Sequence, residues 1–120
     1  MSEDGDNIVM ETFSVEEIIN KLVFHIIGHA GEARGKVFDA FDKIKEKDFE
    51  SAEKLLEEAQ EEIIKAEKCH MILVKKEAKD PGSLPFSLLL VHAEDLMIIA
   101  MSELDLMRKF LEFFKNEYKK

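Results

Sequence analysis

The sequence predicts an all-α protein, an antiparallel up-down-up three-helix bundle. From residue 13 onward, apolar residues recur at alternating steps of three and four, the spacing of helices that pack on helices. The chain has only five glycines and two prolines, which leaves little turn material for a many-stranded fold. The last predicted helix carries two adjacent apolar stripes, one more than a lone bundle covers, so we expect self-association with rotational symmetry.

Composition narrows the classes of function. A chain of 120 residues with 46% apolar residues is most simply one domain, and its net charge of −9 argues against nucleic acid as the main partner. Cys69 is the only cysteine, so no internal disulfide is expected and a cytoplasmic location is natural. The most apolar run, Phe86–Met101, contains two acids and a histidine, so we expect no membrane insertion. Residues 1–12 are acidic and lack periodicity, which predicts a flexible arm before a three-helix domain at 13–120.

The first helix has a clear predicted start. Ser14 and Glu17 form a capping box, with Phe13 and Ile18 placed as the flanking hydrophobic staple. The predicted buried positions that follow are Ile19, Val23, Ile26, Ala30, Ala33, Val37, Ala40 and Ile44.

Gly28, Gly31 and Gly35 interrupt this helix. In an exposed helix interior each glycine costs up to about 1 kcal/mol relative to alanine. We interpret them as marking the close approach of a neighbouring helix or a bend. The alternative is that the missing side chains make room for a phosphate or a partner.

The second helix is predicted to follow a turn at 45–48, with Asp48 as its N-cap, and to stop at Asp80-Pro81-Gly82. Its buried positions are predicted to be Ala52, Leu56, Ala59, Ile63, Ala66, His70 and Leu73.

The third helix is predicted to run from about Phe86 to Tyr118, with Pro85 in its first turn. One apolar stripe consists of Leu89, Ala93, Leu96, Ala100, Leu104, Met107, Leu111 and Phe114. The adjacent stripe consists of Leu88, His92, Asp95, Ile99, Ser102 and Leu106.

His92 and Asp95 are one turn apart on the same side of this helix, whereas Glu94 points away from both. Ionisable groups on an apolar helix are costly unless they are paired, metal-bound or used. A neutral imidazole is a nucleophile that can carry a phosphoryl group reversibly; the alternative is a histidine satisfied within a helix interface. If Asp95 faces a threefold axis, three carboxylates must share protons or bind a hard ion such as Mg²⁺; the alternative is an ordinary exposed aspartate.

A zinc site is a rival hypothesis. His25 and His29 are spaced i, i+4 and Glu32 follows, a spacing that can bind zinc, and His70 lies in the second helix. The sequence has no HExxH or CxxC motif, so surface or interface histidines are the simpler interpretation. His70 could face either His92 or the core.

Three stretches in register resemble a known family. SLLLVHAEDLM (Ser87–Met97) resembles the active-site helix of the lactose/cellobiose-type (N,N'-diacetylchitobiose) enzyme IIA of the bacterial phosphotransferase system (PTS). IIGHAGEARGKVFDAF (Ile26–Phe41) is similar to the family's first-helix motif A/S-G-x-A-R. KDFESAEKLLEEA (Lys47–Ala59) resembles its second-helix opening G-D-F-x-x-A.

The resemblance implies a homotrimer of three-helix subunits and a phosphotransferase component that works through a phosphohistidine. His92 would accept a phosphoryl group from the phosphocarrier HPr and pass it to the cognate IIB component. The IIC permease would be an indirect partner, through which a disaccharide of the lactose, cellobiose or chitobiose type is taken up. Asp95 would lie on the trimer axis and bind one divalent metal per trimer, expected to be Mg²⁺.

The sequence also departs from the family pattern, H-[AG]-Q-D-H-L-M. Glu94 replaces the glutamine, and Leu96 stands where the family has a second histidine. In the second helix Glu67 replaces a histidine, and His70 replaces a glutamine one turn later. The family's second histidine is a plausible partner for the phosphate, and His70 would compensate for its loss if it faces the site. The alternative function is a non-catalytic binding or regulatory module on the same scaffold.

Overall fold

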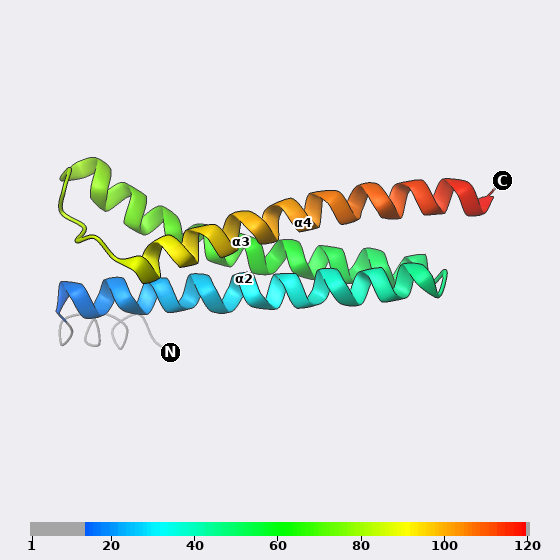
Figure 1. Ribbon diagram of the computed structural model, residues 1–120, viewed down its shortest axis with the longest axis horizontal. Helices are drawn as coiled ribbons and strands as arrows, with labels where there is room; N and C mark the ends of the chain where they lie inside the picture. The colour runs from blue at the N-terminus through cyan, green and yellow to red at the C-terminus, as the bar shows by residue number, and fades with distance from the viewer. Residues whose placement is uncertain (1–13, 120) are drawn as a thin grey trace, which may run out of the picture.

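The computed structural model describes residues 14–119, and within that range the chain is helical with no strand. Helix α2 spans Val15–Lys45, α3 spans Phe49–Lys79 and α4 spans Leu88–Lys119. They lie along one another in an elongated bundle with extents of 59 × 32 × 20 Å (Figure 1). The predicted all-α fold is confirmed. The predicted arm at 1–12 and the staple residue Phe13 lie outside the described residues.

The first predicted helix start is confirmed in α2. Ser14 is extended, and its hydroxyl oxygen accepts a hydrogen bond from the backbone N–H of Glu17 (3.1 Å), which satisfies one of the free donors of the first turn. The buried residues of α2 are the eight predicted from spacing: Ile19, Val23, Ile26, Ala30, Ala33, Val37, Ala40 and Ile44.

The turn between α2 and α3 is a Schellman motif. The N–H of Asp48 donates to the carbonyl of Lys43 and the N–H of Lys47 to that of Ile44, each over 2.9 Å. Lys47 has φ 62°, the left-handed conformation that glycine adopts most readily. Asp48 then caps α3 as predicted, because its carboxylate accepts the N–H of Ser51 (3.2 Å).

Pairs between helices show how α2 and α3 pass each other. Lys36 of α2 pairs with Glu58 (3.6 Å), whereas His29, which lies earlier in α2, pairs with Glu62, which lies later in α3 (2.7 Å). The chain turns back after α2 and again after α3, so that α4 returns along the bundle (Figure 1). None of these three helices combines the length and hydropathy needed to cross a membrane.

The close approach of helices that we expected at Gly28, Gly31 and Gly35 is wrong. All three lie on the exposed face of α2, and a Cβ added at any of them would meet no atom within 4 Å. These glycines are on the side of α2 that points away from the buried seam, so within the described chain no neighbour requires them to be small.

Helix α4 begins at Leu88, two residues after the predicted start at Phe86. Ser87 is the reason, because its hydroxyl accepts the N–H of Leu90 (3.1 Å) and caps the first turn. Pro85 therefore lies in the loop rather than in the first helical turn, and Phe86 stands 88% exposed before the helix.

Candidate functional site

The outward face of α4 carries His92 and Asp95. The residues of α4 that pack toward the other helices are Ala93, Met97, Ala100, Leu104 and Leu111. At about 100° per residue, Asp95 lies nearly opposite that face, and both Asp95 and His92 are exposed. The large apolar side chains left exposed around them on α4 are Leu88, Val91, Ile98, Ile99, Leu106, Phe110 and Phe113.

This uncovered stripe confirms the two-stripe pattern predicted from the sequence. A monomeric soluble protein rarely exposes a continuous apolar patch of this kind, and such patches mark surfaces that bind something.

His92 and Asp95 share one hollow. Together with Leu88, Leu89 and Val91 they line an open depression of about 570 Å³ at the start of α4. Within residues 14–119 no side chain forms a hydrogen bond with the His92 ring, and none forms an ion pair with Asp95. The imidazole is therefore accessible at the surface, with an apolar rim around it and one carboxylate beside it.

His70 does not join this hollow. Its Nε2 lies 2.7 Å from the carboxylate of Glu94, and the contact joins α3 to α4. Glu94 follows His92 by two residues, which turns it about 200° around the helix. Within the single chain, His70 therefore does not lie beside His92, where we had predicted that it could support the site. Sequence reasoning predicted that Glu94 points away from His92. It did not identify Glu94 as the partner of His70.

The loop before α4 is held by Glu77 of α3. One of its carboxylate oxygens accepts the N–H of Gly82 (3.0 Å), and the other accepts the N–H of Leu84 (3.4 Å). With the cap from Ser87, these bonds fix where α4 starts and therefore where His92 stands. No sequence motif had singled out Glu77.

The histidines of the rival zinc site are engaged elsewhere. The rings of His25 and His29 stack with centroids 6.1 Å apart, and Nδ1 of His29 lies 2.7 Å from Glu62. The hydrogen bond from His29 is the main cause that lowers the pKa of Glu62, so this carboxylate stays ionised. Among residues 14–119, no three His, Cys, Asp or Glu side chains come together in a way that could hold a metal.

Cys69 is a poor rival to His92 as a nucleophile. The thiol is partly buried, and burial raises its pKa. A thiol reacts as the thiolate, so the Cys69 side chain stays in its unreactive protonated form at neutral pH.

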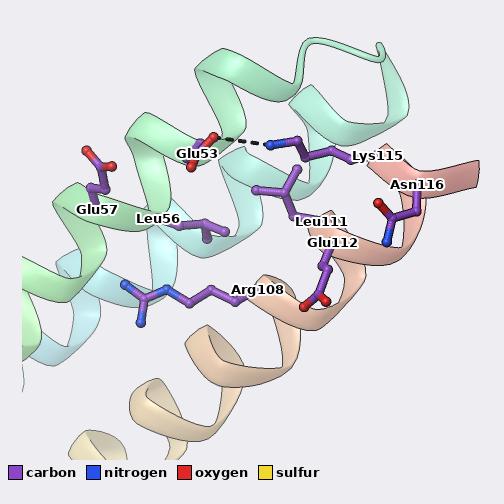
Figure 2. A pocket seen from close by; sticks show the side chains of 8 residues that line it. All are labelled: Glu53, Leu56, Glu57, Arg108, Leu111, Glu112, Lys115 and Asn116. Carbon is purple, nitrogen blue, oxygen red and sulfur yellow. Dashed lines mark hydrogen bonds and ion pairs between the residues drawn. The ribbon is translucent and has the colours of Figure 1, made fainter. Parts of the chain in front are cut away.

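A second depression lies between α3 and α4 toward the other end of the bundle (Figure 2). Its volume is about 430 Å³, and both of its cationic side chains already have partners. Arg108 donates to the side-chain oxygen of Gln60 (2.9 Å), and Lys115 reaches Glu53 (3.5 Å, dashed in Figure 2). No histidine, cysteine or serine lines it.

Asp95 alone does not complete a metal site. A hard divalent cation takes six or more oxygen ligands, and one chain supplies a single carboxylate here.

Comparison with known proteins points to one family. The family model described as "PTS system, Lactose/Cellobiose specific IIA subunit" matches residues 21–115. The lactose-specific EIIA component of Staphylococcus epidermidis is 34% identical over 82% of this chain and 93% of its own length. The lichenan-specific IIA component of Bacillus subtilis is 32% identical, over 85% and 92% respectively.

Solved structures show the same fold. PtcA from S. mutans superposes with a TM-score of 0.79 at 31% identity, covering 86% of this chain and 99% of that one. The PTS cellobiose-specific enzyme IIA from Bacillus anthracis superposes with a TM-score of 0.81 over 92% and 97%, and at 24% identity it supports the fold alone. On the family match and these relatives, this chain belongs to the lactose/cellobiose-specific IIA subunits of the PTS.

Proposed function

We propose that this protein is a cytoplasmic phosphocarrier that accepts a phosphoryl group on His92 from phospho-HPr and passes it to its cognate IIB component. The IIC permease would use that group indirectly, during uptake of a disaccharide of the lactose or cellobiose class. One observation carries the proposal: the His92 ring is exposed on the outer face of α4, with no hydrogen bond to another described side chain. A ring sealed inside the bundle would have had no access to a protein donor.

The transfer needs little from the chain beyond positioning. One ring nitrogen of neutral His92 offers its lone pair to phosphorus, and its other nitrogen keeps the proton. As the new P–N bond forms, the bond between phosphorus and the donor breaks, and its electron pair leaves with the donor. The same exchange in reverse order delivers the group to IIB. Once a partner docks, the apolar rim formed by Leu88 and Val91 would limit the access of water, which favours transfer over hydrolysis.

We further propose that three antiparallel bundles assemble as a homotrimer through the uncovered stripe of α4. Assembly would bury the exposed side chains of Ile99 and Leu106 and bring three copies of Asp95 together. Three converging carboxylates repel one another unless they bind a cation, and oxygen-only ligands favour Mg²⁺. One metal per trimer would then neutralise charge near the phosphorylated ring.

Phosphorylation by purified components tests the assignment. The full chain is incubated with phosphoenolpyruvate, enzyme I and HPr, and intact mass is recorded before and after mild acid. We expect one acid-labile phosphoryl group per chain. His92→Gln should accept none, whereas the matched variant His25→Gln, which changes another exposed histidine, should accept it as the wild type does. Phosphate on His92→Gln would overturn the assignment.

A regulatory module is the second candidate function. Two observations favour it: Leu96 stands where the family has its second histidine, and His70 is held by Glu94 rather than placed beside His92. This candidate predicts that the wild type binds phospho-HPr or IIB without gaining phosphate. The same mass measurement, run alongside a pull-down with HPr, separates the two functions.

A further inference from the structure

An aromatic hollow lies at the end of the bundle far from His92. It sits between the α2–α3 turn and the last turns of α4, and its volume is about 400 Å³. Its walls are mostly apolar, and four of its side chains are aromatic: Phe41, Phe49, Phe114 and Tyr118. The Phe49 and Tyr118 rings meet edge to face at 5.8 Å, which fixes one wall.

Two lysines stand at this hollow. The ammonium of Lys45 lies 5.4 Å from the centroid of the Phe41 ring, and that of Lys47 lies 5.0 Å from the centroid of the Tyr118 ring. Lys45 also pairs with Asp42 (3.1 Å). Lys47 makes no ion pair with a carboxylate in the described part of the chain, so its charge is available to an anion.

The backbone at Lys47 strengthens this interpretation. Lys47 occupies the left-handed position of the Schellman motif with φ 62°, where glycine would be the unstrained choice. A lysine at this position accepts unfavourable backbone energy and places a cation over the rim of an apolar hollow. Residues held in sparsely populated conformations concentrate at functional sites, and here the strained residue lines the hollow itself.

We propose that this hollow binds a small organic anion with a flat aromatic body and one carboxylate or sulfonate group. The aromatic body would pack among the rings of Phe41, Phe114 and Tyr118, and the anionic group would meet Lys47. Glu117 also lines the hollow and Lys45 is paired with Asp42, so Lys47 is the cation that would meet the anionic group. A hollow of this size, apolar with a few polar groups, falls within the range of small-molecule sites.

This site is separate from the phosphorylation site. Tyr118 follows His92 by 26 residues along α4, which is about 39 Å at 1.5 Å per residue. Loss of binding at the hollow is therefore expected to leave phosphate acceptance at His92 unchanged.

The chain carries its own reporter. Tyr118 is the only tyrosine and there is no tryptophan, so the tyrosine fluorescence of the protein comes from this hollow. The full-length protein is titrated with 8-anilinonaphthalene-1-sulfonate, an aromatic sulfonate. We expect saturable binding of one probe per chain, together with quenching of the Tyr118 emission.

Three variants locate the probe. Lys47→Gly removes the charge while suiting the left-handed backbone, so it should fold and bind the probe about fivefold to tenfold more weakly. Lys47→Arg keeps the charge and should bind as the wild type does. Lys68→Gln, a change at an exposed lysine of α3, serves as the matched control and should also bind normally.

Competition tests the ligand class. 4-Phenylbutanoate should displace the probe, whereas the neutral 4-phenylbutanamide should not. Equal binding by the wild type and Lys47→Gly, or probe binding without quenching of Tyr118, would place the probe elsewhere, for example on the apolar stripe of α4. Either result would overturn the proposal.

Discussion

The contact between His29 and Glu62 gives a prediction whose size can be worked out from the structure. The carboxylate of Glu62 is 17% exposed, lies 2.7 Å from Nδ1 of His29 and accepts a second bond from Lys65 (3.2 Å). The substitution Glu62→Gln keeps the shape of the side chain and removes its charge. It therefore probes the ionic part of the link between α2 and α3.

The expected loss is about 1 kcal/mol. Hydrogen bonds to charged groups contribute roughly 1.5–3 kcal/mol, and the glutamine oxygen keeps a neutral hydrogen bond worth about half of that. The bond to Lys65 adds little, because the side chain of Lys65 is 55% exposed. For a chain of this length, about 1 kcal/mol corresponds to a fall in Tm of about 4 °C.

The loss should depend on pH in a defined direction. The hydrogen bond from His29 lowers the pKa of Glu62 below its ordinary value of 4.5, so the folded state keeps the carboxylate ionised at a lower pH than the unfolded state does. Stability from this group is therefore complete above about pH 4.5 and disappears as pH falls through the lower pKa of the folded state. The difference between the wild type and Glu62→Gln should shrink accordingly.

Urea unfolding followed by circular dichroism, at fixed protein concentration and at several pH values, measures this difference. Glu61→Gln is the matched control, because Glu61 is the adjacent glutamate and is exposed. It should change stability little at any pH. The reasoning is refuted if both variants lose equal stability near neutral pH, or if the deficit of Glu62→Gln persists well below pH 4.

Three further outcomes are expected. Leu104→Ala, at a side chain that is 1% exposed, should lower the free energy of unfolding by about 3 kcal/mol, whereas Ile72→Ala, at a side chain that is 55% exposed, should cost far less in the same urea titration. Ser87→Ala removes the acceptor for the N–H of Leu90 and should cost about 1 kcal/mol, and faster amide exchange at Leu90 would be its signature. Asp95→Leu should preserve or tighten the proposed assembly in light scattering and abolish Mg²⁺ binding in calorimetry; weaker assembly would contradict the axial placement of Asp95.

Periodicity predicted the buried face of this fold well. All eight predicted positions of α2 are buried, and in α3 every predicted position is buried except His70. The spacing of three and four succeeds because a helix in a small bundle has one side available for burial. The third helix is the weaker case. Met97 is buried although it was not part of the predicted stripe, and Phe114 is 38% exposed and lines the aromatic hollow. Three other members of that stripe are only partly buried: Leu89, Leu96 and Met107.

Local capping and contacts between helices were harder to predict. The start of α4 was placed two residues early because Pro85 suits a first turn, and the choice between it and the Ser87 cap depends on the loop that Glu77 holds. The partner of His70 could not be found from periodicity, because the spacing along α3 does not say which residue of α4 lies at the same level. The exposed position of His92 followed from the second stripe alone.

The three exposed glycines of α2 have a consequence for stability. Since nothing lies within 4 Å of a methyl group added at Gly28, Gly31 or Gly35, alanine fits at each position, and each exchange would add up to about 1 kcal/mol to the helix. A triple-alanine variant should therefore be more stable while the buried side of α2 packs as before. Any interaction that needs exposed backbone on the glycine side of α2 would be lost in that variant.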